Sequence, residues 1–204
     1  MKEIIRTITW PSQNLENADF LLTKEWLVTN GLGGYASGTI SGINTRRYHG
    51  LLIAALPSPY GRVVMLNQLN ETVIFPDGSR VRLNGEERTS CALQMYGNCY
   101  LAEFSLKKGL PVWLYQINEI TLEKRVFMRH QQNTVQISYR VLSGETSITL
   151  ELQPNVHFRP HHEPVDTALH APYILTIAPE SYELSSEPNH PVLRMLFHGP
   201  EVSF

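Results

Sequence analysis

Four consecutive polar side chains, Arg46, Arg47, Tyr48 and His49, are the part of the sequence best equipped for binding or chemistry. An arginine presents five N–H donors in a planar fork, and a tyrosine combines an apolar ring face with a hydroxyl group. A sugar has hydroxyl edges and C–H faces, so this set could bind a glycan. The same arginines could instead pair with carboxylates of a neighbouring domain. In an extended strand Arg46 and Tyr48 would face one way and Arg47 and His49 the other, which would make one pair structural.

The residues before this set could complete such a surface. Six glycines lie between residues 31 and 50, and glycine lets another chain or a ligand approach the backbone closely. Trp26 and Tyr35 could each offer a ring to a sugar, and Asn30 adds a polar side chain among the glycines. We therefore expect the block 25–53 to form a shaped, polar surface.

A second polar set lies downstream. Its members are His157, Arg159, His161, His162 and Glu163. Three histidines within six residues suggest zinc, but this spacing provides no convincing further ligand, and two adjacent histidines point apart in an extended chain. The sequence predicts no metal and no other cofactor here. Arg159 and His162 remain candidates for contact with a substrate or a neighbouring domain.

The segment Gly31-Leu32-Gly33-Gly34-Tyr35-Ala36 formally fits the dinucleotide-binding pattern G-x-G-x-x-A. That pattern binds a pyrophosphate only where a helix begins directly after the glycines. The following residues, 37–42, read SGTISG and form a poor helix, and no acidic residue lies at 51–55 to hold a ribose. We therefore expect these glycines to serve tight turns and close strand crossings, without a bound nucleotide.

Hydrolysis of a glycosidic bond requires two carboxylates about 5–10 Å apart. The candidates in this chain are Glu25, Glu71, Glu103, Glu119, Glu123 and Asp166. On one strand Glu119 and Glu123 would be separated by about 13 Å, which is too far for that reaction. The alternation of Glu123, Lys124 and Arg125 is typical of a solvated or ion-paired edge. The sequence therefore predicts no catalytic residues in this chain.

Several segments, taken in order, resemble one known family. They are EWLVTNGLGGYASGTISGINTRRYHGLLI at 25–53, LNQLNETV at 66–73, LPVWLYQI at 110–117, LEKRVFMRHQQNT at 122–134 and NVHFRPHH at 155–162. They resemble the N-terminal domain of bacterial and archaeal glycogen debranching enzymes of the amylo-α-1,6-glucosidase type, from about Trp26 to His162. That family usually reads Arg-Asp-aromatic-His where this chain has Arg159-Pro160-His161-His162. The proline puts in doubt any charge pairing made by that aspartate.

The resemblance implies a β-supersandwich that precedes a helical catalytic barrel, and the catalytic carboxylates belong to that barrel. Whether this chain acts as an enzyme stays open, and we expect the chain alone to be inactive. It would support the helical catalytic domain, in the same or another chain, and could help to shape the entrance for glycogen or a related α-glucan. Two alternatives remain: a free-standing α-glucan-binding module, and a purely structural or dimerising domain.

The pattern of apolar residues favours strands throughout. Val135, Ile137, Tyr139 and Val141 alternate with polar residues, which is typical of a half-buried antiparallel strand, and Asp77-Gly78 is a strong hairpin signal. We expect strands at 3–9, 24–29, 48–56, 62–69, 71–75, 79–83, 100–106, 111–117, 119–129, 134–142, 146–153, 172–178 and 192–198. Residues 154–172, rich in proline and histidine, form the longest expected irregular segment. The sequence predicts an all-β fold, a large two-sheet and mostly antiparallel sandwich that forms a single domain over 1–204.

Composition limits the partners. The formal net charge of −2 and the pI near 6.4 argue against nucleic acid and anionic membranes. No apolar run approaches the roughly 20 residues of a membrane-spanning helix, and the first residues lack the features of a signal peptide. We therefore expect a cytoplasmic protein. Charged residues make up 18% of the chain, below the usual ~25%, so part of the surface is expected to be covered by another domain or subunit.

Overall fold

The computed structural model describes residues 5–9, 17–88, 91–169, 171–179, 181–186, 190–199 and 202. The fold is all-β and sandwich-like, as the sequence predicted, and α1 (Asn17–Thr23) is the only helix in this described part. The chain divides into two compact units, Met1–Pro164 and Val165–Phe204. The single domain expected over 1–204 stays a prediction.

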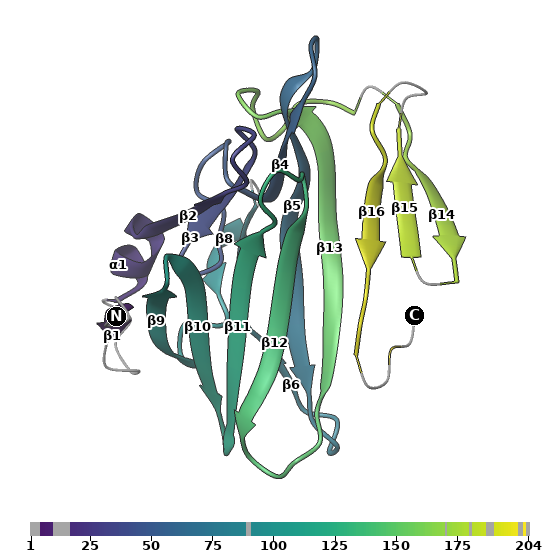
Figure 1. Ribbon diagram of the computed structural model, residues 1–204. Helices are drawn as coiled ribbons and strands as arrows, with labels where there is room; N and C mark the ends of the chain where they lie inside the picture. The colour runs from purple at the N-terminus through teal and green to yellow at the C-terminus, as the bar shows by residue number, and fades with distance from the viewer. Residues whose placement is uncertain are drawn as a thin grey trace. The chain divides into compact units, whose positions relative to one another are not determined.

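The first unit contains two antiparallel sheets that form two layers (Figure 1). One sheet has the strand order β1-β9-β10-β11-β12. Its strands are β1 (Ile5–Thr9), β9 (Leu101–Lys107), β10 (Leu110–Ile117), β11 (Ile120–Met128) and β12 (Val135–Ser143). All four neighbouring pairs in this sheet are antiparallel, so short turns suffice between β9 and β12. Residues 3 and 4 of the first expected strand lie outside the described residues.

The other sheet has the order β13-β5-β4-β3-β2, with β6 paired to β5. Its strands are β2 (Glu25–Thr29), β3 (Tyr35–Thr39), β4 (Gly50–Leu56), β5 (Gly61–Ile74), β6 (Arg80–Arg82) and β13 (Thr149–Pro160). The chain therefore crosses from one layer to the other between β12 and β13. The strands β7 (Gly85–Arg88) and β8 (Cys91–Met95) pair with each other in a separate two-stranded antiparallel sheet.

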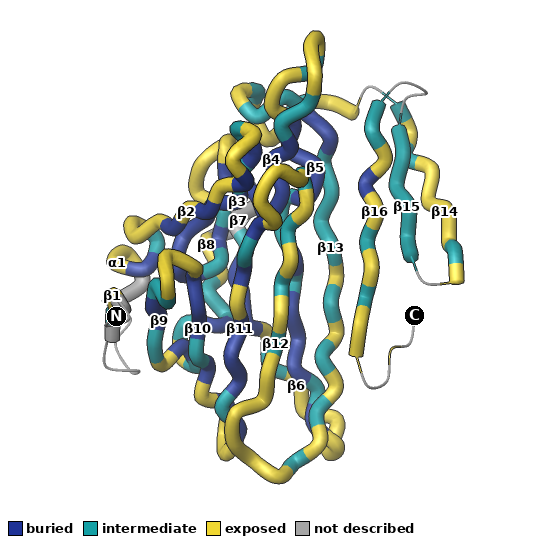
Figure 2. Tube along the Cα trace, viewed as in Figure 1, coloured by how far each residue is buried: buried dark blue, intermediate teal, exposed yellow. Residues whose placement is uncertain are grey.

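Aromatic side chains fill the space between the layers. Trp26 of β2 meets Trp113 of β10 edge to face with ring centroids 5.3 Å apart, and Phe104 of β9 lies 5.2 Å from the same Trp113 ring. Each indole N–H donates to a main-chain oxygen, Trp26 to Thr39 at 3.1 Å and Trp113 to Ile40 at 2.9 Å. Their polar atoms are thus satisfied although the rings are buried. Figure 2 shows the buried residues concentrated in β3, β4, β10 and β11, whereas β12 is exposed along most of its length.

The charged run at 123–125 corrects part of the sequence interpretation. β11 is an interior strand, and Glu123 and Lys124 are both buried. Glu123 is paired with Arg125 at 2.7 Å and lies 3.5 Å from Lys107. Lys124 faces the other layer and lies 2.6 Å from Glu71. The run is therefore ion-paired, as one interpretation predicted, but it does not lie at an edge, and only Arg125 is exposed to solvent. Glu119 precedes β11 and bonds Thr146, so it does not share a strand face with Glu123.

The turns follow local chemistry. The hairpin predicted at Asp77-Gly78 is present: Gly78 has a positive φ of 83°, and the Asp77 carboxylate accepts the N–H of Ser79 at 2.8 Å. Hydrogen bonding by the Ser79 side chain, and then by its N–H, lowers the pKa of Asp77. A turn also joins β11 and β12 at residues 129–134, as predicted.

The expectation of an irregular segment at 154–172 is wrong for its first part, because β13 continues to Pro160. β13 is the last strand of its sheet, so a proline can occupy a position whose missing N–H would have faced away from β5. Two register shifts interrupt the pairing of β13 with β5 near Val156. Such irregularities bend a strand, so the end of β13, which carries Arg159, runs in a different direction from its beginning.

The second unit is a three-stranded antiparallel sheet. Its strands are β14 (Ile174–Ala178), β15 (Ser181–Ser185) and β16 (Leu193–Leu196). Residues in register share a face, so Leu175, Leu184 and Leu193 form one apolar row. The opposite face carries the ion pair between Arg194 and Glu183. The strands expected at 172–178 and 192–198 are confirmed, but β15 was not predicted.

None of the helices in the described residues has the length and apolar character needed to cross a bilayer.

Candidate functional site

The connection between β3 and β4 carries the set first identified in the sequence. The N–H of His49 donates to the Arg46 carbonyl at 3.0 Å, which closes a turn, and the strand begins only at Gly50. The expected strand at 48–56 therefore starts two residues later. The prediction that the four side chains point alternately to opposite faces of a strand is wrong. Arg46, Arg47 and Tyr48 are all exposed, and only His49 is buried.

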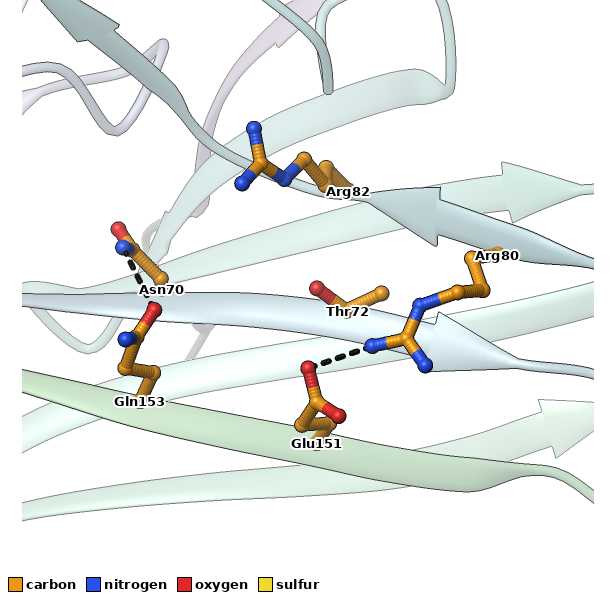
Figure 3. A pocket seen from close by; sticks show the side chains of 6 residues that line it. All are labelled: Asn70, Thr72, Arg80, Arg82, Glu151 and Gln153. Atoms are coloured by element: carbon orange, nitrogen blue, oxygen red, sulfur yellow. Dashed lines mark hydrogen bonds and ion pairs between the residues drawn. The ribbon is translucent and has the colours of Figure 1, made fainter.

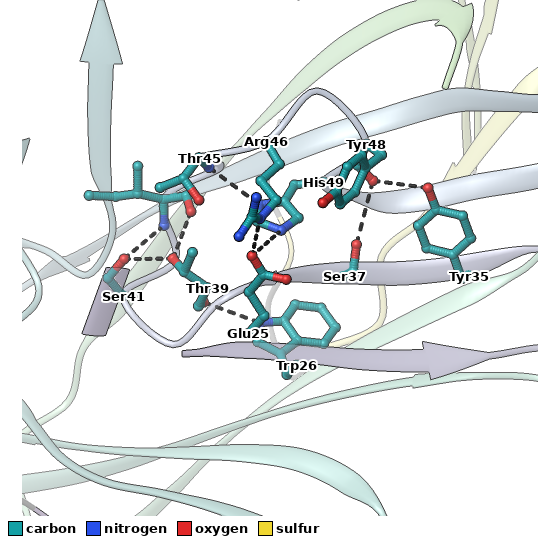
Figure 4. A network of polar contacts seen from close by, with 11 residues as sticks. Glu25, Trp26, Tyr35, Ser37, Thr39, Ser41, Thr45, Arg46, Tyr48 and His49 are labelled. Carbon is teal, nitrogen blue, oxygen red and sulfur yellow. Dashed lines mark hydrogen bonds and ion pairs between the residues drawn. The ribbon is translucent and has the colours of Figure 1, made fainter. Parts of the chain in front are cut away.

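Glu25 of β2 holds this turn from below (Figure 4). Its Oε1 atom accepts from Nε of Arg46, and it lies 3.6 Å from Nε2 of His49. The hydrogen bond with Glu25 raises the pKa of Arg46. Thr45 donates its N–H to Nδ1 of His49 at 3.2 Å, so the proton of a neutral imidazole resides on Nε2 and faces Glu25. Burial lowers the pKa of His49, although Glu25 opposes that effect.

Two tyrosines frame the turn. The hydroxyl of Tyr35 on β3 donates to the Tyr48 carbonyl at 3.0 Å, which fixes the backbone at Tyr48. The Tyr48 ring meets the His49 ring edge to face at 5.7 Å and keeps 40% of its surface exposed. Burial raises the pKa of Tyr35, against the opposing charges of Arg62 and Arg159. The turn thus exposes an aromatic ring beside the Arg46 fork.

Arg159 brings the two polar sets of the sequence together. Its Nη2 atom donates to the Arg47 carbonyl at 2.5 Å, and Nη1 donates to the Glu163 carbonyl at 2.9 Å. Only 2% of Arg159 is exposed, and burial lowers its pKa. His161 follows it and contacts the Tyr35 ring edge to face at 6.4 Å. Arg159 therefore fixes the turn through its guanidinium group and is not itself open to a ligand.

We call the resulting group the corner cluster. Arg46, Arg47 and Tyr48 are exposed, Tyr35 is partly exposed, and the residues that support them are the exposed Glu25 and the buried His49 and Arg159. His162 is exposed and contacts the His161 ring at 5.6 Å, beside the cluster.

Two predicted site residues lie elsewhere. Trp26 is 6% exposed and belongs to the aromatic core, so its ring faces are covered by protein. Asn30 is fully buried, and its amide group donates to Gln132 and Asn133 at 3.0 Å each. Its Oδ1 atom accepts from the N–H groups of Leu32 and Gly34. Asn30 thus ties the β2–β3 turn to the β11–β12 turn, and both residues support the sandwich that carries the cluster.

The glycines at 31–34 serve this turn. Gly31 and Gly33 have positive φ angles of 80° and 95°. A Cβ atom on Gly34 would lie 2.6 Å from the Asn30 amide nitrogen and 3.0 Å from the Ile53 carbonyl oxygen. A strand, β3, follows these glycines instead of a helix, so the segment offers no helix N-terminus to a phosphate.

The side chains of the cluster offer hydrogen-bond donors and acceptors and an aromatic ring. Glu25 is engaged by Arg46, and we find no second carboxylate bonded within the described part of the cluster. Within the described residues, no group of three histidine, cysteine, aspartate or glutamate side chains could hold a metal ion. Three buried polar atoms in this region have no hydrogen-bond partner among the described residues: Nε2 of His49 within the cluster, and Nδ1 of His161 and Oε2 of Glu163 beside it. Burial lowers the pKa of His161.

Glu25 is the residue that sequence reasoning missed. It was one of six scattered carboxylates, and 21 positions separate it from Arg46. No spacing rule pairs residues that meet only because β2 and β3 are neighbours in the sheet.

A family model described as "Glycogen debranching enzyme N terminal" matches residues 24–203, which is nearly the whole chain. The chain belongs to the glycogen debranching enzyme N-terminal family. This confirms the resemblance found in the sequence, and the match spans both compact units of the chain. No curated protein and no solved structure matches the chain significantly. The glycogen debranching enzyme N-terminal match includes every member of the corner cluster.

Proposed function

We propose that this chain is a non-catalytic domain of a glycogen debranching enzyme-like protein. It supports a helical catalytic domain, in the same or another chain, and its corner cluster contacts an α-glucan substrate at the entrance. The parent enzyme would hydrolyse α-1,6 branch linkages in glycogen or a related glucan. Such a protein would act in the cytoplasm, where glycogen is stored.

One observation carries this proposal: an exposed Arg46–Tyr48 turn is held by contacts with Glu25, Tyr35 and two buried side chains, His49 and Arg159. Binding sites need side chains whose positions are set before the ligand arrives. Glu25 orients the Arg46 fork, and Arg159 and Tyr35 fix the carbonyls of Arg47 and Tyr48. The guanidinium group can donate to sugar hydroxyls, and the Tyr48 ring can cover a C–H face.

The proposed lack of catalysis rests on the carboxylates. A glycosidase needs one carboxyl group as acid and a second as base or nucleophile. In the described residues Glu25, Glu71, Glu123 and Glu151 are each engaged by a lysine or an arginine. We expect the purified chain to release no glucose from a branched dextrin. Release above a buffer blank would contradict the proposal.

Binding is tested by titrating maltoheptaose into the chain and into Arg46→Ala. Loss of a charged hydrogen-bond donor costs about 1.5–3 kcal/mol, so the affinity should fall by roughly tenfold or more. Arg140 is exposed on β12 of the other sheet, and Arg140→Ala is the matched control. Equal losses in both variants would show a general charge effect and count against the cluster.

The alternative of a structural or docking role has its own support. Leu175 and Ile177 on β14 are 53% and 71% exposed, and a sheet face of this kind is typical of a surface that another protein segment covers. If the chain binds no glucan but binds a separately produced helical catalytic domain, the supporting role stands without the glucan contact.

A further inference from the structure

The sheet that contains β5, β6 and β13 has a polar hollow of about 330 Å³ on its outer face (Figure 3). None of the residues that line this hollow belongs to the corner cluster. The lining consists of Asn70, Thr72, Arg80, Arg82, Glu151 and Gln153. Its volume falls at the low end of the range for small-molecule sites.

Strand register explains why the surface is hollow there. Thr72 of β5 stands directly between Glu151 of β13 and Arg82 of β6, and residues in register share a face. Thr72 is short and only 8% exposed, so it forms the floor. The longer side chains on both sides form the walls. Glu71, the preceding residue, points into the sandwich, as the alternation of a strand requires.

The walls are held in place by contacts within the protein. Arg82 lies over the Tyr96 ring at 4.7 Å, and its Nη1 atom is 3.7 Å from Glu86. Asn84 donates to the Asn70 side-chain oxygen at 2.7 Å. Asn70 donates in turn to Gln153 at 3.4 Å. A ligand would therefore meet side chains that already contact one another.

The charges of the hollow are nearly balanced. Arg80 is paired with Glu151 at 2.6 Å, and Glu86 faces Arg82. A phosphate or carboxylate would have to approach the Glu151 carboxylate, so an anion is disfavoured. The guanidinium groups donate, Glu151 accepts, and the amides and the hydroxyl do both. Adjacent sugar hydroxyls each donate and accept hydrogen bonds. Planar guanidinium, carboxylate and amide groups can bind two such hydroxyls at once.

We propose that this hollow is a second carbohydrate subsite, which takes a neutral α-glucan chain away from the corner cluster. The identity of the sugar as an α-glucan rests on the proposed function. None of the described residues that line the hollow is aromatic, so binding is weak and works as an additional contact along a long polymer. A branched polysaccharide would gain more from it than a short oligosaccharide.

The test is an amide NMR titration of the full chain with maltoheptaose. Amides of Thr72, Arg82 and Gln153 should shift together and give one dissociation constant. In Gln153→Ala that constant should rise by roughly fivefold, since one hydrogen-bonding group is lost. Thr72→Phe fills the floor with a residue that favours strands, and should abolish these shifts. Gln136→Ala, at an exposed position on β12, is the matched control.

The outcomes separate this inference from the proposed function. If the amides of Arg46 and Tyr48 shift while those of the hollow do not, the subsite is refuted and the corner cluster stands. If only the hollow responds, the subsite stands without the cluster. No response at either place refutes both. If inorganic phosphate produces the same shifts at lower concentration, the hollow is an anion site and the inference is wrong.

Discussion

The Nζ atom of Lys124 on β11 lies 2.6 Å from Oε1 of Glu71 on β5, and this ion pair joins the two layers of the sandwich inside the core. The hydroxyl of Tyr139 on β12 donates to the same carboxylate oxygen. Lys124 also lies over the Trp113 ring at 5.3 Å. A buried charge pair of this kind fixes how two apolar layers are placed, because either charge alone would be costly.

Lys124→Met should therefore destabilise the fold strongly. The substitution keeps most of the length of the side chain but leaves the Glu71 carboxylate buried, with Tyr139 as its hydrogen-bond donor among the described side chains. Removing one partner of a buried pair costs about 3–5 kcal/mol, which urea denaturation would measure. The double variant Glu71→Leu with Lys124→Met removes both charges and should recover much of this loss.

The control for that substitution is Arg80→Met. Arg80 and Glu151 form an exposed pair, with about half of each side chain open to solvent. Exposed pairs contribute at most about 1 kcal/mol. A loss on Lys124→Met no larger than that of Arg80→Met would mean that the core pair does not join the layers.

Tyrosine ionisation offers a second test of the same region. Burial, with the Glu71 charge, raises the pKa of Tyr115 and Tyr139 well above 10. Above pH 10 the unfolded chain has released these protons and the folded chain has not, so stability falls as the pH rises. Ultraviolet titration of the folded chain should miss part of the signal of its nine tyrosines, and the urea-unfolded chain should give all of it.

The Tyr115→Phe and Tyr139→Phe double variant identifies the missing signal. It should lower the amplitude of the unfolded chain and leave that of the folded chain near pH 10 unchanged. A reduced amplitude in the folded double variant would mean that these hydroxyls ionise freely.

Two glycines of the 25–53 block test whether close packing requires glycine at a given position. Gly34→Ala should cost about 2 kcal/mol, since its Cβ atom would overlap the Asn30 side chain and the Ile53 carbonyl. Gly38→Ala is the control, because its Cβ atom would make only ordinary contacts at 3.5 Å. Its effect should stay below about 1 kcal/mol. Denaturation midpoints measure both, and equal effects would contradict the packing described for Gly34.

The corner cluster should respond to acid through His49. Burial lowers the pKa of folded His49 below its ordinary 6.5, so at lower pH the unfolded chain binds the proton more readily. The contribution of neutral His49 to the free energy of unfolding is complete above about pH 6.5 and is lost as the pH falls below that value. The unfolding free energy should therefore drop less steeply between neutral pH and about pH 5 in His49→Asn than in the original chain. Parallel pH profiles would exclude this role.

Much of the fold could be predicted because its signals are local. Alternation at Val135–Val141 and the Asp77-Gly78 turn depend on neighbouring residues, and both correspond to elements of the structure. β13 was underestimated since Pro154 and Pro160 suggest a loop unless the strand is known to lie at an edge.

The site was harder to predict because its contacts join distant parts of the chain. The Arg46 turn and the Arg159 segment were each identified, but the bond from Arg159 to the Arg47 carbonyl spans 112 positions. Lys124 and Glu71 likewise meet only when two sheets are stacked. Residue type indicated which side chains could bind a ligand. Only the fold could show that Trp26 and Asn30 are buried and support the sandwich.

The central claim is that the exposed corner cluster binds an α-glucan. Its most direct test is calorimetric titration of maltoheptaose into the full chain and into its Tyr48→Ala and Tyr48→Phe variants. We expect the alanine variant to bind at least about tenfold more weakly, a change of about 1.4 kcal/mol, and the phenylalanine variant to retain binding through its ring. Equal affinities in all three proteins, or no heat in any of them, would contradict the claim.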